Sequence, residues 1–273
     1  MQAGCKSDAK FGAKSMEKIY YYTSFGVLHN IVTNRELWLN SVWSMADYTE
    51  IRYFIHTLQQ ALENNFPELT EDSKRLFKKV SELLDKTDFY AMSFTTARDD
   101  VAMWERFAKS GKGVCLVFAL DKLQRFAKEN ELIISELAYP SDIVRLEQFN
   151  TIYNWLTYDK LTNPQSEIEV IENLVMTSVF HKDPAFRSEK EIRMSTNWTP
   201  QLDKRIHYKL VSEMIRKAYI LTEPEMMGDI KISDMLCEVI IGPTSRQSER
   251  ELQDFLKKYR YNDTTVSKSA CPL

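Results

Sequence analysis

Two glutamates one residue apart, with an arginine close behind, stand in the segment FRSEKEIRM at residues 186–194. In the strand expected over residues 186–196, Glu189, Glu191 and Arg193 share one face. The opposite face carries Lys190, Ile192 and Met194, of which Ile192 and Met194 are expected to face the core. On spacing alone, the simplest interpretation is a solvated acidic edge with Arg193 as a local partner. Carboxylates that face a cleft would instead repel each other, which raises the pKa of one of them and suits it to catalysis.

Hydroxyl side chains lie at the end of a second expected strand, FYAMSFT at residues 89–95. Ser93 and Thr95 suit cap and turn hydrogen bonds, and hydroxyls at a strand end also suit a ribose or an amide. Thr96 and Asp99 form a capping-box pattern, which predicts that a helix begins there. Both a purely structural and a ligand-binding interpretation remain open for these hydroxyls.

Three consecutive tyrosines occur in the β-prone segment KIYYYTS at residues 18–24. Tyr20, Tyr21 and Tyr22 fit the alternation of a strand between core and surface. Three tyrosines at the start of a strand would equally form a stacking wall for a planar ligand. Ser24 is expected to cap a short helix that follows.

Several common kinds of site find little support in the sequence. The segment SGKGV lacks the Ser or Thr and the glycine spacing of a phosphate-binding loop. The four histidines are isolated, so no metal site is expected, and Cys115 lies in an apolar run and is expected to be buried and inert. A Cys–His nucleophile pair stays open, because such partners meet in space and not in sequence.

The composition is typical of a soluble protein of the reducing cytoplasm. The formal net charge of −3 supplies no global basic field for nucleic acid, although a local basic groove stays open. The scattered cysteines show no disulfide or metal spacing. No apolar run reaches the length of a membrane-spanning helix, and no apolar segment precedes QAGC as a signal peptide requires. We therefore expect a cytoplasmic location and no membrane partner.

The periodicity of the chain predicts an α+β fold. A flexible tail is expected over residues 1–16, and a single domain over 17–273 with helical insertions near 48–88 and 121–180. Apolar residues at helical spacing predict helices over about 51–62, 71–86 and 248–259. Strands are expected at the following positions: 18–24, 36–42, 89–95, 113–120, 131–138, 186–196, 206–222, 235–242 and 264–268.

Four segments, taken in order, resemble a bacterial family known as a domain of unknown function. They are IYYYTS, AMSFTTARDDVAMWERFAKSGKGVCLVF, KDPAFRSEKEIRM and VIIGPTSRQSERELQDFLKKY followed by VSKSACP. The family pattern reads Y-x-Y-T-S, then S-F-S with a later G-x-G-V, then K and E-x-E-x-R, then G-P. The C-terminal CPL departs from the closing P-Y-R of that pattern, so an arginine found there in the family is absent.

The same order of short motifs is similar, more distantly, to the ADP-ribosyltransferase fold, which has a split β-sheet core. Tyr21 with Thr23, Ser93 with Thr95, and Glu189 with Glu191 stand at its three motif positions. Tyr21 replaces the more usual histidine or arginine. The resemblance implies NAD as the substrate, and two helical insertions that frame the cleft and choose the acceptor.

Each motif residue has a role that this second resemblance implies. Glu191 would stabilise the oxocarbenium-like transition state through the ribose 2′-hydroxyl, and Glu189 would orient or deprotonate the acceptor. Ser93 would hold Glu191 or the nicotinamide ribose. The remaining expected cofactor contacts are Tyr21, Tyr22, Thr23, Thr95 and Arg193.

Three functions remain in competition. The resemblance favours an NAD-consuming ADP-ribosyltransferase or NAD glycohydrolase, in a toxin-like or anti-phage effector that modifies an unknown protein or nucleic acid and has a cognate antitoxin or regulatory partner. The second is a non-catalytic module that binds a nucleotide or a partner protein in the same cleft. The third is a metal-dependent nuclease that would use Asp47, Glu50 and the glutamate pair.

Overall fold

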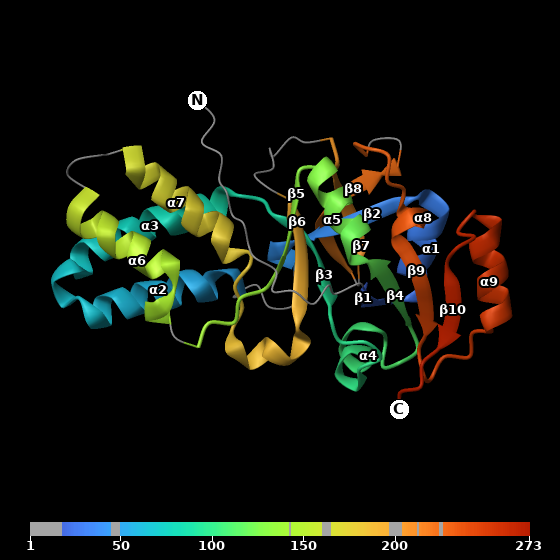
Figure 1. The fold of residues 1–273 in the computed structure, drawn as a ribbon. Coiled ribbons are helices and arrows are strands. Elements are labelled where there is room, and N and C mark those ends of the chain that lie inside the picture. Colours follow the sequence, from blue (N-terminus) through green and yellow to red (C-terminus); the bar gives the residue numbers. More distant parts are fainter. Residues whose placement is uncertain are drawn as a thin grey trace.

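The chain forms an α+β fold in which a mixed, mostly antiparallel sheet packs against several helices (Figure 1). The expected N-terminal tail at 1–16 and Asp47 lie outside the residues that the structure describes. The computed structural model describes residues 18–44, 50–141, 143–159, 165–196, 204–211, 213–223 and 226–273.

The described strands join in one sheet, with an order of β10-β9-β4-β1-β3-β2-β8-β7 and with β6 and β5 added beyond β3. Their pairings are antiparallel except for the parallel pair β9 and β10. The strands are β1 (Lys18–Thr23), β2 (Glu36–Ser41), β3 (Tyr90–Thr95), β4 (Val114–Ala119), β5 (Leu132–Glu136), β6 (Glu191–Thr196), β7 (Ile206–Val211), β8 (Met214–Thr222), β9 (Leu236–Ile241) and β10 (Thr265–Lys268).

The sheet divides at β3. One edge of β3 pairs along its length with β6, from Ala91 to Thr95. The other edge meets β1 at Thr95 and β2 at Ala91 and Tyr90. Among the described strands, none pairs with residues 92–94 on that second edge, so β1 and β2 diverge there and leave a fork.

The helices form two groups (Figure 1). Beside the sheet lie α1 (Phe25–Asn34), α4 (Val101–Phe107), α5 (Leu120–Glu129), α8 (Ile232–Met235) and α9 (Glu249–Lys258). A separate helical unit consists of α2 (Glu50–Asn65), α3 (Thr70–Lys86), α6 (Glu147–Asn154) and α7 (Gln165–Ser178). The two predicted insertions therefore meet in one unit. Of the second insertion, α5 and β5 belong with the sheet instead, because their apolar side chains join its core.

The two groups have separate cores. Strands β1, β3, β4, β6 and β9 bury one face against α1, α5 and α9, and the apolar side chains of the helical unit bury one another. Strand β3 contributes to both cores, through Met92 and Phe94 on the first and Ala91 on the second. No helix within the described residues is both long and apolar enough to cross a bilayer.

Three local predictions are wrong. The strand expected over 186–196 begins only at Glu191, because Pro184–Glu189 forms a 3-10 helix capped by Asp183 and Lys190 then turns with φ 46°. Lys190 is consequently exposed and does not share the buried face of Ile192 and Met194, whose burial is confirmed.

The other two concern a helix start and a hairpin. Helix α4 begins after Asp100, whose carboxylate accepts the N–H groups of Ala102 and Met103, and not at Thr96. Asp99 instead adopts a left-handed conformation with φ 50°. The strand expected over 206–222 is the hairpin of β7 and β8, and Glu213 at its turn has φ 66°. The expected strand at β1 and the Ser24 cap of α1 are confirmed.

Candidate functional site

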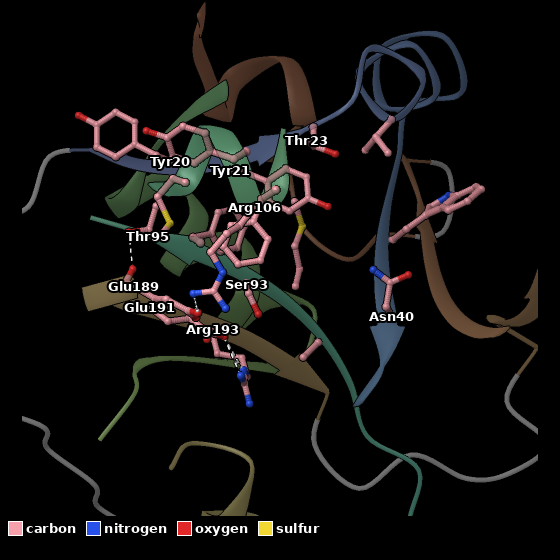
Figure 2. Close-up of a pocket in the computed structure, with 18 of the residues that line it drawn as sticks. Tyr20, Tyr21, Thr23, Asn40, Ser93, Thr95, Arg106, Glu189, Glu191 and Arg193 are labelled. Atoms are coloured by element: carbon pink, nitrogen blue, oxygen red, sulfur yellow. Dashed lines mark hydrogen bonds and ion pairs between the residues drawn. The ribbon is translucent and has the colours of Figure 1, made fainter. Parts of the chain in front are cut away.

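A pocket of about 520 Å³ opens at the fork of the sheet. Its volume lies within the range of small-molecule sites, roughly 300–1,000 Å³. Figure 2 shows β1 with Tyr20, Tyr21 and Thr23 on one side and the acidic pair on another, with Asn40 of β2 set apart from both. The eight residues predicted from the sequence all line it: Tyr21, Tyr22, Thr23, Ser93, Thr95, Glu189, Glu191 and Arg193.

The acidic pair is buried and shares one lysine. Glu189 and Glu191 are 4% and 5% exposed, which rejects the solvated edge. Nζ of Lys182 lies 2.8 Å from Oε2 of Glu189 and 3.0 Å from Oε2 of Glu191. The backbone N–H of Lys182 donates to Ala138, which fixes the lysine beside β5. One buried cation therefore offsets the repulsion between the two carboxylates.

Two arginines complete the ion-pair cluster, which consists of Arg106, Lys182, Glu189, Glu191 and Arg193. Nε and an Nη of Arg193 each lie 2.8 Å from Oε1 of Glu191, and the guanidinium also donates to the carbonyl of Val179. Arg193 is 1% exposed. Arg106 of α4 pairs with Oε1 of Glu189 at 2.6 Å, but its own side chain is 47% exposed. The cluster thus runs from a dry interior to the pocket mouth.

The cluster holds Glu191 ionised. Burial raises the pKa of Glu191, but Arg193, Lys182 and a hydrogen bond from Ser93 together outweigh burial and lower it below its usual value. For Glu191, this reverses the raised pKa expected of a repelling pair. A carboxylate with a depressed pKa is charged at neutral pH and serves as an electrostatic stabiliser, not as a general acid.

The register between β3 and β6 explains why hydroxyls and charges meet. Ser93 lies opposite Arg193, and Thr95 opposite Glu191, so these four side chains share one face of the sheet. Thr95 donates to the carbonyl of Glu189 at 2.6 Å and accepts the N–H of Ala97 at 3.0 Å. Thr95 is thereby committed to holding the 3-10 turn, whereas Ser93 remains half-buried in the pocket wall.

The tyrosines do not form one stacking wall. Tyr20 and Tyr22 pack with Trp104 on one face of β1, and Tyr21 contacts Phe94 on the other face, with ring centroids 5.8 Å apart. The hydroxyl of Tyr22 donates to Ala97 at 2.9 Å. Burial raises the pKa of both Tyr21 and Tyr22, so both phenols are neutral at physiological pH.

The other nucleophile and metal candidates contribute nothing to the pocket. Cys115 is fully buried in β4, and burial raises the pKa of its thiol. His181 stacks on Phe54 and its Nδ1 contacts the carbonyl of Thr177. Within the described part of the chain, no group of three or more His, Cys, Asp or Glu side chains could hold a metal ion.

Sequence reasoning missed four cations of the pocket: Arg106, Lys182, Lys209 and Arg216. Lys182 is the K of the K-then-E-x-E-x-R pattern, and this was its only signal. Arg106 lies far from the glutamates in sequence, and only the fold brings α4 to them. Lys209 of β7 lines the far end of the pocket with Trp38. Five basic and three acidic side chains line the pocket: Arg106, Lys182, Arg193, Lys209 and Arg216 against Glu36, Glu189 and Glu191.

The segment that carries the ion-pair cluster also carries the similarity to known proteins. Residues 103–194 match a family described as a protein of unknown function, DUF2971. The DUF2971 match spans α4 to the first part of β6, and so contains every member of the ion-pair cluster. Of the other strands that line the pocket, β1, β2 and β3 precede the match, and β7 and β8 follow it. No curated protein and no solved structure shows a significant match to the chain.

Proposed function

We propose that the pocket binds NAD and that the protein cleaves the bond between nicotinamide and ribose, as an ADP-ribosyltransferase or an NAD glycohydrolase. The observation that carries this proposal is the Glu191 carboxylate, which lines the pocket and is held ionised by Arg193, Lys182 and Ser93. Cleavage of that bond develops positive charge on the ribose. A carboxylate fixed beside the sugar stabilises the transition state more than the ground state.

The divided sheet supports the proposal. The split sheet of the ADP-ribosyltransferase fold is the architecture implied by the sequence motifs, and here β1 and β2 leave a fork against β3. The pocket lies at that fork and carries more basic than acidic side chains. This balance of charge favours an anionic ligand such as a dinucleotide.

Each pocket residue then has a role in the proposed reaction. Glu191 would face the ribose 2′-hydroxyl, with Ser93 holding its carboxylate. Glu189 would orient or deprotonate the acceptor once its ion pair with Arg106 opens, and the side chain of Arg106 is exposed enough to move away. Tyr21 would line the sugar or ring site with a neutral hydroxyl, whereas the hydroxyl of Tyr22 is already held by Ala97 and Asp100. Arg193 already pairs with Glu191, so it positions that carboxylate instead of binding a phosphate.

The test is release of nicotinamide from NAD by the purified protein. Glu191→Gln keeps the shape and removes the charge, so we expect turnover to fall by about 10²–10³-fold. Glu238→Gln is a matched control, because Glu238 is also buried in a strand and paired with an arginine, Arg98, at 3.1 Å. We expect that variant to keep its activity. Full activity of the Glu191 variant would remove this residue from the mechanism.

A specific observation favours a second candidate, a non-catalytic nucleotide-binding module. Oε1 of Glu191 already contacts Arg193 and Oε2 already contacts Lys182. A carboxylate engaged on both oxygens suits the positioning of cations for an anionic ligand as well as it suits catalysis. This candidate predicts that NAD or ADP-ribose raises the melting temperature without nicotinamide release.

Fewer observations support the nuclease and effector roles. Asp47 and the side chain of Glu50 lie outside what the structure describes, so of the expected nuclease carboxylates only the glutamate pair is placed, and three cations already pair with it. Nucleic-acid cleavage that stops on addition of a chelator would establish the nuclease role.

An effector role predicts growth arrest when the protein is expressed in bacteria, and Glu191→Gln should relieve the arrest. A protein or nucleic-acid acceptor and a cognate antitoxin are further parts of the effector proposal.

A further inference from the structure

Lys209 stands at the end of the pocket away from the ion-pair cluster. It belongs to β7, and its amino group lies against the ring face of Trp38 on β2. Its Nζ is shielded from solvent and has no hydrogen-bond partner among the described residues. The indole Nε1 of Trp38 is likewise shielded from solvent and has no hydrogen-bond partner among the described residues. Two buried donors without acceptors at one end of a pocket indicate a place for a ligand atom.

Burial, and not the charges around it, favours the neutral amine of Lys209. Burial lowers the pKa of Lys209 to about 7, against the opposing effect of Glu36 on β2. Arg216 of β8 lies directly across the hairpin, and His207 lies two residues earlier on β7. Lys217, the next residue of β8, provides the contrast, since an ion pair with Asp88 at 2.8 Å raises its pKa.

We propose that Lys209 is a reactive amine that condenses with the aldehyde of a phosphorylated ligand bound in this pocket. The unpartnered Nζ attacks the carbonyl carbon, the carbinolamine loses water, and an imine remains. Both amine hydrogens leave with the carbonyl oxygen in that water, and no oxidant or reductant takes part. Neutral lysines in apolar sites are the ones that form such imines.

A phosphorylated aldehyde fits the other groups at this end of the pocket. Arg216 lines the pocket beside Lys209 and is half-buried, so its guanidinium is placed for a phosphate oxygen. The inference does not depend on NAD cleavage, although ADP-ribose combines phosphates with a sugar that opens to an aldehyde.

The probe is pyridoxal 5′-phosphate, trapped on the full chain with cyanoborohydride and located by peptide mass spectrometry. Near pH 7 about half of Lys209 is neutral, against well under 1% of an ordinary lysine. We therefore expect Lys209 to be labelled at least about tenfold faster than Lys217, with a rate that rises to a plateau just above pH 7. Equal labelling of the two lysines, or a rate that still climbs at pH 9, would overturn the proposal.

Two variants and a second probe sharpen the result. Lys209→Arg keeps a long basic side chain that forms no such imine, and it should lose the label while circular dichroism stays unchanged. Glu36→Gln removes the group that raises the pKa of Lys209, so the midpoint of labelling should move to lower pH. Pyridoxal without its phosphate should label Lys209 more slowly. If it labels equally fast, the phosphate part of the proposal is wrong.

Discussion

Removal of the lysine that joins the two glutamates gives the sharpest test of the ion-pair cluster. In Lys182→Met, an apolar chain of similar length keeps the contact with Phe186 but leaves Glu189 and Glu191 without their shared cation. The side chain of Lys182 is 9% exposed and each glutamate side chain is 5% exposed. Loss of one partner of a buried pair costs about 3–5 kcal/mol. Because Arg193 and Arg106 remain beside the glutamates, we expect the free energy of unfolding to fall by about 3 kcal/mol, the lower end of this range.

Arg106→Met is the matched control. It also removes a cation from Glu189, but the side chain of Arg106 is 47% exposed, so the loss should be only about 0–1 kcal/mol. Both free energies of unfolding come from urea titrations followed by circular dichroism. In the double variant Lys182→Met with Glu189→Gln, part of the stability should return, because one uncompensated charge is gone.

The pH dependence separates an electrostatic cost from a packing cost. Glu191 has a pKa below its usual value in the folded protein. Its ionised form therefore contributes stability that is present above the unfolded pKa and is lost as the pH falls through the folded pKa. The difference in the free energy of unfolding between wild type and Lys182→Met should have its full size at pH 7 and should disappear below about pH 4. A difference that persists in acid, or one no larger than that of Arg106→Met, would refute the reasoning.

Two further predictions concern the frame of the pocket. Gly113→Ala would place a methyl group against the carbonyl of Thr23, and the free energy of unfolding should fall by at least about 1–3 kcal/mol. Gly26 is exposed in α1, and a methyl group there would make only an ordinary contact with Ser24, so Gly26→Ala should leave stability equal or raise it by up to about 1 kcal/mol. Thermal melts of both variants compare them. Tyr22→Phe removes a hydroxyl that bonds Ala97 at 2.9 Å and Asp100 at 3.0 Å, and urea titration should show a loss of about 1–3 kcal/mol, so an unchanged midpoint would mean that this hydroxyl does not hold the loop before α4.

Most of the strands and helices followed from periodicity, and so did the face that Ile192 and Met194 bury. Local patterns could not show where β6 begins, because its first residue follows a 3-10 turn and a left-handed residue at Lys190. Alternation through that turn placed Glu189 in the strand. The expected neighbours of Glu189 were correct although its expected backbone conformation was wrong. The 3-10 turn places Glu189 beside Glu191 and their shared partner Lys182.

Whether Glu189 and Glu191 form a solvated face or line a cleft depends on their ion-pair partners, which sequence spacing does not reveal. Arg106 and Lys182 come from α4 and from the segment after α7, and their meeting with Glu189 is a property of the whole fold. The union of the two helical insertions in one unit is likewise a long-range result, carried by the apolar faces of α2, α3 and α7. Helical spacing predicted those faces but not what each would cover.

The ion-pair cluster also bears on why charge is kept in this interior at all. Buried ion pairs are weak devices for stability, since apolar side chains of similar volume often do as well or better. A cluster that keeps Glu191 ionised within a pocket wall is therefore better explained by a need for that charge. Its cations exceed its carboxylates by one, with Arg106, Lys182 and Arg193 against Glu189 and Glu191. An anionic ligand would complete this balance, and its negative charge would meet Arg106 first, because that cation stands at the exposed end.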